Sequence, residues 1–126
     1  MIIPDPLPNS GFSIPVRASF LVFKKFPILG VATNNAAPRL ELFNDRMQLR
    51  VITRQIRRYE DLDYVDARQT LRTQYVVLCW RRSFFAFAAN IGAEEPLIEV
   101  LRFFQRRGVA LADRARGIVA RQAPRS

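Results

Sequence analysis

The segment EEPLIEVLRFFQRRG, residues 94–108, carries the clearest helical pattern in the chain. Its apolar side chains recur at the i, i+3, i+4 and i+7 spacing that places them on one face of an α-helix. Those residues are Leu97, Val100, Leu101 and Phe104. Glutamates at the start and arginines at the end suit the helix dipole, and Gly108 suits a helix stop. The pattern predicts an amphipathic helix that covers a sheet.

The residues before this helix predict that sheet. Two runs, 73–80 and 83–89, are apolar on both faces, which is typical of central strands with one face covered by another layer. Residues 39–43 and 46–53 alternate with period two, and the Asn-Asp dipeptide between them closes a hairpin. We expect three further strands: one over 16–23, a short one that ends at Arg58, and one over 63–69. Residues 24–38 predict a long connection that contains at most a short helical turn.

Three stretches together resemble a known fold: PRLELFNDRMQLRVI at 38–52, RRYEDLDYVDAR at 57–68 and PLIEVLRFFQRRG at 96–108. A strand pair, a tyrosine-containing acidic corner, two more strands and a capping helix, in this order, resemble the pleckstrin-homology-like (PH-like) fold in its small bacterial form. The resemblance covers roughly residues 16–108. It implies an α+β, mainly β domain: a strongly bent antiparallel sheet or partly open barrel of about six or seven strands, capped by one C-terminal amphipathic helix. It also implies binding of lipid head groups, peptides or proteins, and not catalysis.

The segments on either side of residues 16–108 differ from the domain in composition. Residues 1–15 contain four prolines, which interrupt regular pairing, and they predict an extended N-terminal arm. Residues 109–126 predict a basic C-terminal tail that is compatible with a short helix before a disordered end, although Gly117 weakens the helix. We therefore expect one domain with two flanking segments.

Four carboxylates lie within seven residues and raise the question of a metal or catalytic site. They are Glu60, Asp61, Asp63 and Asp66. A calcium loop starting at Asp61 would need glycine at its sixth position and glutamate at its twelfth, where the chain has Asp66 and Arg72. A general acid–base pair would need a cleft and a perturbing neighbour, and the sequence indicates neither. The spacing favours a turn whose acids face nearby arginines.

Basic residues predict two candidate binding surfaces. The net charge is +9, and +6 of it lies in residues 102–126, which hold seven arginines and one aspartate. The first surface is a ladder on the outer sheet face, formed by Arg46, Arg50, Arg54 and Arg68. The second is the tail, with Arg106, Arg107, Arg114, Arg116 and Arg121. Each surface suits an acidic partner or phosphates, while an arginine-biased composition and a solvated face explain the same charges without a function.

The chain has no histidine and a single cysteine, Cys79. This excludes His-dependent catalysis and Cys/His zinc sites, and we expect no catalytic residues, no metal and no cofactor. The leading hypothesis is a non-enzymatic PH-like binding module that engages a protein partner or an anionic membrane surface. The alternative is a small nucleic-acid-associated protein that uses its arginine-rich tail.

Location and assembly rest on general features of the sequence. No apolar run reaches the roughly 18–20 residues of a membrane span, so we expect a cytoplasmic protein that binds a membrane, if at all, at its surface. Sheet edges and spare aromatic side chains are also compatible with a homo-oligomer.

Overall fold

The computed structural model describes residues 1–24, 30–34, 39–51 and 53–121. Within these residues the chain forms nine strands, one short 3-10 helix and two α-helices. The strands are β1 (Phe12–Ser13), β2 (Ala18–Phe23), β3 (Gly30–Asn34), β4 (Arg39–Leu42), β5 (Met47–Arg50), β6 (Arg54–Arg57), β7 (Leu62–Gln69), β8 (Gln74–Trp80) and β9 (Phe85–Asn90). The helices are η1 (Tyr59–Asp61), α1 (Glu94–Arg106) and α2 (Asp113–Arg121).

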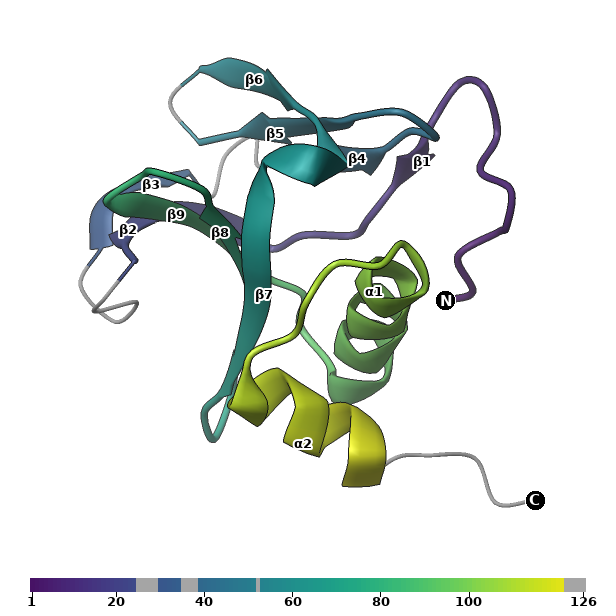
Figure 1. Ribbon diagram of the computed structural model, residues 1–126. Helices are drawn as coiled ribbons and strands as arrows, with labels where there is room; N and C mark the ends of the chain where they lie inside the picture. Colours follow the sequence, from purple (N-terminus) through teal and green to yellow (C-terminus); the bar gives the residue numbers. More distant parts are fainter. Residues whose placement is uncertain (25–29, 35–38, 52, 122–126) are drawn as a thin grey trace.

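The strands form two open antiparallel sheets, which Figure 1 shows facing one another. The four-stranded sheet has the order β1-β4-β5-β6, and the five-stranded sheet has the order β3-β2-β9-β8-β7. One continuous segment, residues 12–23, supplies β1 to the first sheet and β2 to the second. The predicted class, α+β and mainly β with open sheets, is confirmed. The expected number of strands was too low, because β1 and β3 fell in stretches assigned to an arm and a connection.

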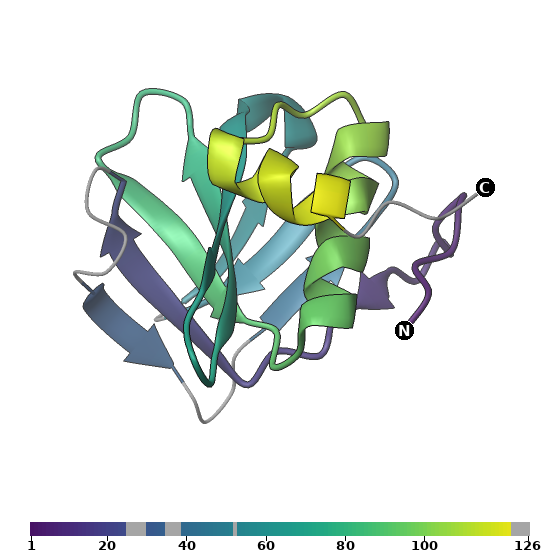
Figure 2. The ribbon, with the colours of Figure 1, turned by 90° about the horizontal axis from the view of Figure 1, so that it is seen from below.

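Helix α1 supplies the centre of the hydrophobic core. Its predicted apolar stripe is fully buried, and it packs against β8. The helix ends as predicted, because Gly108 adopts a positive φ of 81° and lets the Val109 N–H bond back to the Phe104 carbonyl at 3.0 Å. Figure 2 shows α1 and α2 together on the same side of the sheets.

The predicted hairpin and acidic corner are also confirmed. Strands β4 and β5 pair across the Asn-Asp turn, with Leu40 opposite Leu49 and both side chains buried. The corner is η1, where the Asp61 carboxylate accepts a hydrogen bond from the Arg58 backbone N–H at 3.3 Å. This capping bond explains why an acid stands at that position.

Strand β3 lies where the sequence predicted a connection. Its residues pair with β2 in antiparallel register, from Ser19 opposite Asn34 to Val22 opposite Gly30. Gly30 and Asn34 are residue types that weaken strands, but β3 is the last strand of its sheet and needs a partner on one side alone. The rest of the predicted connection, 25–29 and 35–38, lies outside the described residues.

The N-terminal segment does more than extend over the surface. Ile3, Leu7 and Ile14 are buried in the main core. The Leu7 backbone bonds twice to the Asn44 side chain, through its N–H at 3.0 Å and its carbonyl at 2.8 Å. These contacts attach the segment to the β4–β5 turn.

The C-terminal segment also packs as part of the domain. The Val65 N–H donates a hydrogen bond to the Ala110 carbonyl, and the Val65 carbonyl accepts one from the Ala112 N–H, each at 2.9 Å, so this stretch bonds to the outer edge of β7 at Val65. Helix α2 then buries Ala115 and Ile118. The predicted disordered end, residues 122–126, lies outside the described residues.

We predict that Ile118→Ala destabilises the protein by about 2–4 kcal/mol, because it removes a buried side chain from the α2 contact. Arg114→Ala on the exposed side of the same helix is the matched control and should change the free energy of unfolding by less than about 0.5 kcal/mol. Urea unfolding monitored by circular dichroism measures both values. Equal effects of the two variants would show that α2 does not contribute to the core.

Candidate functional site

Three arginines lie side by side across the four-stranded sheet. Strand register places Arg39 opposite Arg50, and Arg50 opposite Arg54. Residues directly opposite in an antiparallel pair share a face, with Cβ atoms about 4.5–5.5 Å apart. All three residues are exposed, since the alternate positions Leu40 and Leu49 turn inward. We call Arg39, Arg50 and Arg54 the arginine row.

Nearby carboxylates neutralise only part of the positive charge of the arginine row. Arg39 forms an ion pair with Glu41 at 2.5 Å. Among the described residues, no ion pair includes Arg50 or Arg54. Like charges directly opposite one another destabilise a sheet, so an anion bound beside the row would stabilise it.

The row ends at an exposed sheet edge. Strand β6 is the last strand of the four-stranded sheet, and an edge strand presents backbone donors and acceptors to its surroundings. On the same outer face Ile56 is 61% exposed, opposite Gln48. The surface formed by the arginine row, Ile56 and the β6 backbone therefore combines cationic, apolar and hydrogen-bonding groups.

The structure divides the predicted ladder. Arg50 and Arg54 belong to the arginine row, but Arg46 lies at the β4–β5 turn, 4.2 Å over the Phe43 ring and paired with Asp45 at 2.8 Å. Arg68 lies on β7 in the other sheet, opposite Tyr75. The predicted ladder did not include Arg39, although counting outward from the Asn-Asp turn places it opposite Arg50.

The five predicted tail arginines differ in their contacts. Arg107 lies 4.5 Å over the Tyr59 ring and donates a hydrogen bond to the Asn44 carbonyl. Arg116 bonds to the Leu111 carbonyl at 2.9 Å, and Arg121 bonds to the Gln69 side chain at 3.1 Å. The remaining two, Arg106 and Arg114, are exposed. Arg107 therefore joins the end of α1 to the hairpin and the corner, Arg116 bonds within its own segment, and Arg121 joins the C-terminal segment to β7.

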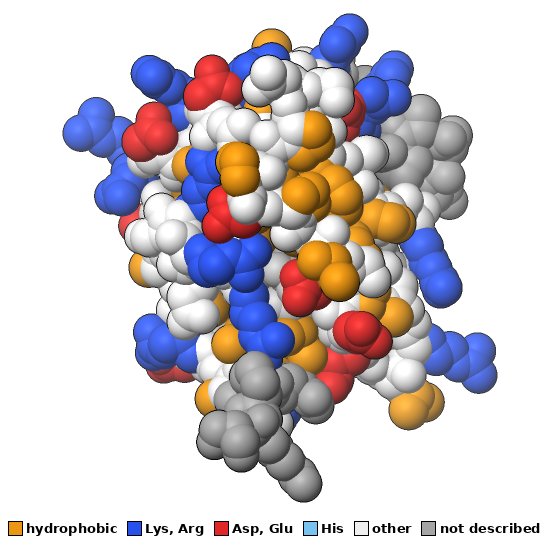
Figure 3. Space-filling view, turned by 90° about the vertical axis from the view of Figure 1, so that its right-hand side faces the viewer, with side chains coloured by type: hydrophobic (Ala, Val, Ile, Leu, Met, Phe, Trp, Pro, Cys, Tyr) orange, Lys and Arg blue, Asp and Glu red, His pale blue; other side chains and the backbone are white. Residues whose placement is uncertain are grey.

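The side of the molecule that bears the N-terminal segment carries both signs of charge (Figure 3). Figure 3 shows one short column of basic side chains near the middle of this face, with hydrophobic side chains beside it. Elsewhere on the face the basic side chains are dispersed and interleaved with acidic ones. This pattern is typical of a solvated surface with local ion pairs.

The four acids of the corner point to different partners. Glu60 pairs with Arg58 at 3.4 Å and Asp63 with Lys24 at 3.1 Å. The Asp66 carboxylate accepts a bond from the adjacent Ala67 backbone N–H at 2.8 Å. Within the described ranges, no three Asp, Glu or Cys side chains converge in a way that could hold a metal ion. Glu60 and Asp66 thus bond within a few residues of the corner, whereas Asp63 joins the corner to the end of β2.

Tyr59 connects this corner to the hairpin and to α1. Its hydroxyl donates a hydrogen bond of 2.5 Å to the Phe43 carbonyl, and its ring packs against Phe103 and Phe104. Burial raises the pKa of the Tyr59 phenol from 10.0 to about 12, although the nearby Arg107 guanidinium acts in the opposite direction. Tyr59 is therefore neutral over the physiological range.

The single thiol is also in its neutral form. Cys79 is buried, and its burial raises the pKa of the thiol to about 11, while a hydrogen bond with Tyr64 lowers it in part. The thiolate is the nucleophilic form of cysteine, so this environment disfavours reaction.

Comparison with known proteins assigns no relationship. No protein-family model matches the chain, and no curated protein matches it. None of the helices in the described part of the chain has the length and apolar character needed to cross a membrane.

We predict that raising the pH from 10 to 12 destabilises the fold through Tyr59. Between these pH values the unfolded chain loses the phenolic proton while the folded chain retains it, so the free energy of unfolding falls as pH rises. Tyr59→Phe should weaken this alkaline dependence and cost about 1 kcal/mol at neutral pH, because the bond to Phe43 is lost. Urea unfolding across the alkaline range tests this prediction. An unchanged pH dependence in Tyr59→Phe would contradict it.

Proposed function

We propose that the protein is a non-enzymatic binding module with a PH-like fold, and that it engages an extended acidic segment of a partner protein along β6. The fold proposal is supported by two features of the described residues. The sheets are open and share the continuous segment 12–23, and α1 closes one end of the space between them. The chain also has no histidine, the commonest residue for proton transfer in catalysis.

The arginine row carries the proposal for an acidic partner. Charged residues on an edge strand often protect it from unwanted pairing, and this would account for Arg54. It does not account for Arg39 and Arg50, which lie on interior strands. Three like charges in register become favourable when carboxylates lie next to them.

Strand pairing supplies the geometry of the proposed complex. A partner segment added antiparallel to β6 would bond to its backbone and place alternate side chains on each face. Acidic side chains beside Arg54 would meet the arginine row, and an apolar side chain would cover Ile56. The proposal therefore names a partner segment that alternates acidic and apolar residues on one face.

The same charges disfavour self-association at this edge. A two-fold axis between two antiparallel β6 strands would keep the outer faces of both copies on the same side, so it would place their two arginine rows next to one another on one face of the joined sheet. Like charges on neighbouring strands are destabilising. An acidic partner therefore fits the edge better than a second copy does. The proposal places the complex in the cytoplasm, where a lone thiol stays reduced.

We predict that an N-acetylated peptide with the repeat Glu-Ser-Val-Ser, which places Glu and Val alternately on one face of a strand, binds the protein, whereas its Lys-Ser-Val-Ser counterpart does not. The double variant Arg50→Gln/Arg54→Gln should weaken binding about tenfold, since each exposed ion pair contributes up to about 1 kcal/mol. The matched control Arg72→Gln/Arg114→Gln removes the same charge at exposed sites remote from β6 and should bind normally. Fluorescence anisotropy of a labelled peptide measures the affinities.

Amide hydrogen exchange separates strand pairing from general attraction of anions. Bound peptide should protect the backbone amides of residues 54–57 that point away from β5, which are every second residue, and proline substitutions in the peptide should abolish this protection. Binding that protects no β6 amide, or that survives in the Arg50/Arg54 double variant, would refute the proposal. Binding to anionic vesicles or to duplex DNA in place of the peptide would instead favour a membrane or nucleic-acid role.

A further inference from the structure

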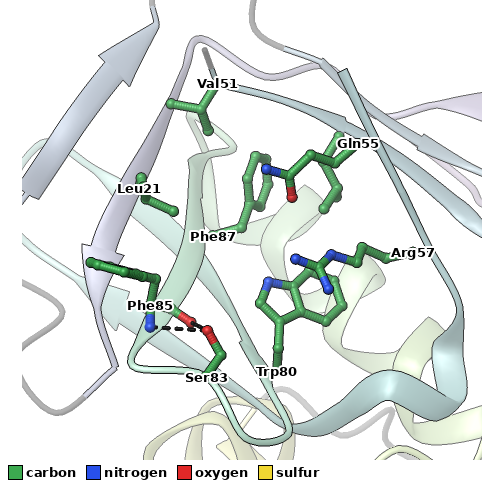
Figure 4. Close-up of a pocket in the computed structure, with 9 residues that line it drawn as sticks. Leu21, Val51, Gln55, Arg57, Trp80, Ser83, Phe85 and Phe87 are labelled. Carbon is green, nitrogen blue, oxygen red and sulfur yellow. Dashed lines mark hydrogen bonds between the residues drawn. The ribbon is translucent and has the colours of Figure 1, made fainter. Parts of the chain in front are cut away.

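A cavity of about 190 Å³ lies between the two sheets. Figure 4 shows its residues arranged around a central space, with β5 and β6 on one side and β2, β8 and β9 on the other. Its walls are largely apolar and aromatic, and they include Leu21, Leu49, Trp80, Phe85 and Phe87. We call this space the inter-sheet cavity.

Arg57 brings a positive charge to this apolar space. Register pairs Arg57 with Met47, whose side chain is fully buried, so Arg57 lies on the inner face of β6. Its guanidinium lies 5.2 Å from the centre of the Trp80 ring and lines the cavity (Figure 4). Arg57 is half-buried, and no carboxylate of the described residues forms an ion pair with it.

Gln55 adds a second polar group on the same side. In Figure 4 its amide points toward the cavity, one inward position before Arg57 on β6. A guanidinium and an amide can both donate hydrogen bonds to one carboxylate. The cavity thus joins an apolar chamber to adjacent donors, which is the usual composition of a small-molecule site.

We propose that the inter-sheet cavity binds a small aromatic monocarboxylic acid. The ring would pack among the apolar and aromatic walls, and the carboxylate would accept hydrogen bonds from Arg57 and Gln55. The carboxylate of the ligand would form the ion pair that Arg57 does not form with any carboxylate of the described residues. Arg57 keeps its planar fork oriented by stacking on Trp80, which favours two parallel bonds to a carboxylate.

The volume limits the ligand to a single ring system with a short acidic arm. A protein cavity of about 150 Å³ is known to hold benzene, and drug-sized ligands occupy roughly 300 Å³ or more. At about 190 Å³ the inter-sheet cavity falls between these values and nearer the first. One guanidinium also matches one carboxylate better than it matches a doubly charged phosphate ester.

Trp80 makes the test direct, because it is the only tryptophan in the chain. Phenylacetate, benzoate and indole-3-acetate are titrated separately into the full-length protein. The indole N–H signal of Trp80 in NMR spectra reports binding of all three acids. Tryptophan fluorescence is a second readout for those acids that do not themselves fluoresce at the same wavelengths. For at least one acid, the shift of the Trp80 indole N–H signal should reach a plateau as the acid is added. The shifts of the Gln55 and Arg57 side-chain signals should reach a plateau in the same titration. Its neutral amide should bind at least about tenfold more weakly, because it offers no charge to the guanidinium.

Three variants locate the binding. Arg57→Gln should weaken binding of the acid at least about tenfold and leave binding of the neutral amide unchanged. Arg54→Gln removes the same charge from the opposite face of the same strand and is the matched control, with no expected change. Gln55→Phe, at an exposed position whose side chain points toward the cavity, should fill it and abolish binding of both ligands. Thermal unfolding verifies that each variant is folded.

Three outcomes would overturn the proposal. The first is the absence of saturable binding by any of the three acids. The second is equal affinity of wild type and Arg57→Gln for the acid. The third is an equal loss in Arg54→Gln, which would indicate attraction to surface charge. The first two outcomes do not bear on the acidic peptide proposed for β6, because that proposal rests on the outer face and the edge of the strand, and the third would place the bound anion at the arginine row in place of the cavity.

Discussion

Burial of the α1 stripe is the constraint on which the rest of the structure depends. Leu97, Val100, Leu101 and Phe104 are fully buried, and a helix with such a face is stable only when other layers cover it. The η1 corner meets the same helix through Tyr59, which also bonds to the hairpin carbonyl of Phe43. Because one end of the space between the sheets is filled in this way, the inter-sheet cavity lies among the strands away from the helix stripe.

Local patterns in the sequence predicted local structure well. The α1 stripe, the hairpin and the η1 corner are each encoded within a few consecutive residues. Pairing with distant segments is not encoded so directly: β3 depends on β2, and the buried Leu7 depends on the side chain of Asn44. The placement of Arg68 in the predicted ladder was wrong for the same reason. Alternation along a strand predicts which face a residue lies on, but not which of two sheets the strand joins.

The arginines show how one residue type serves several purposes in a basic protein. Arg107 stacks on Tyr59 and Arg116 holds the start of α2, so these charges contribute to the fold. Arg50 and Arg54 lie outward in register with like charges, and Arg57 faces inward toward an aromatic wall. Net charge alone could not distinguish these roles, because each is decided by strand register and by the nearest partner.

The cover that residues 110–112 place on β7 has a consequence for the integrity of the molecule. A bare strand edge of this length is a template for intermolecular pairing and fibrous aggregates. The Val65 bonds to Ala110 and Ala112 block that template within the chain itself. A protease cut just after Gly108 would leave this cover held by side-chain packing and by the Val65 bonds alone, so the short stretch between the helices ties the protection of the β7 edge to the continuity of the chain.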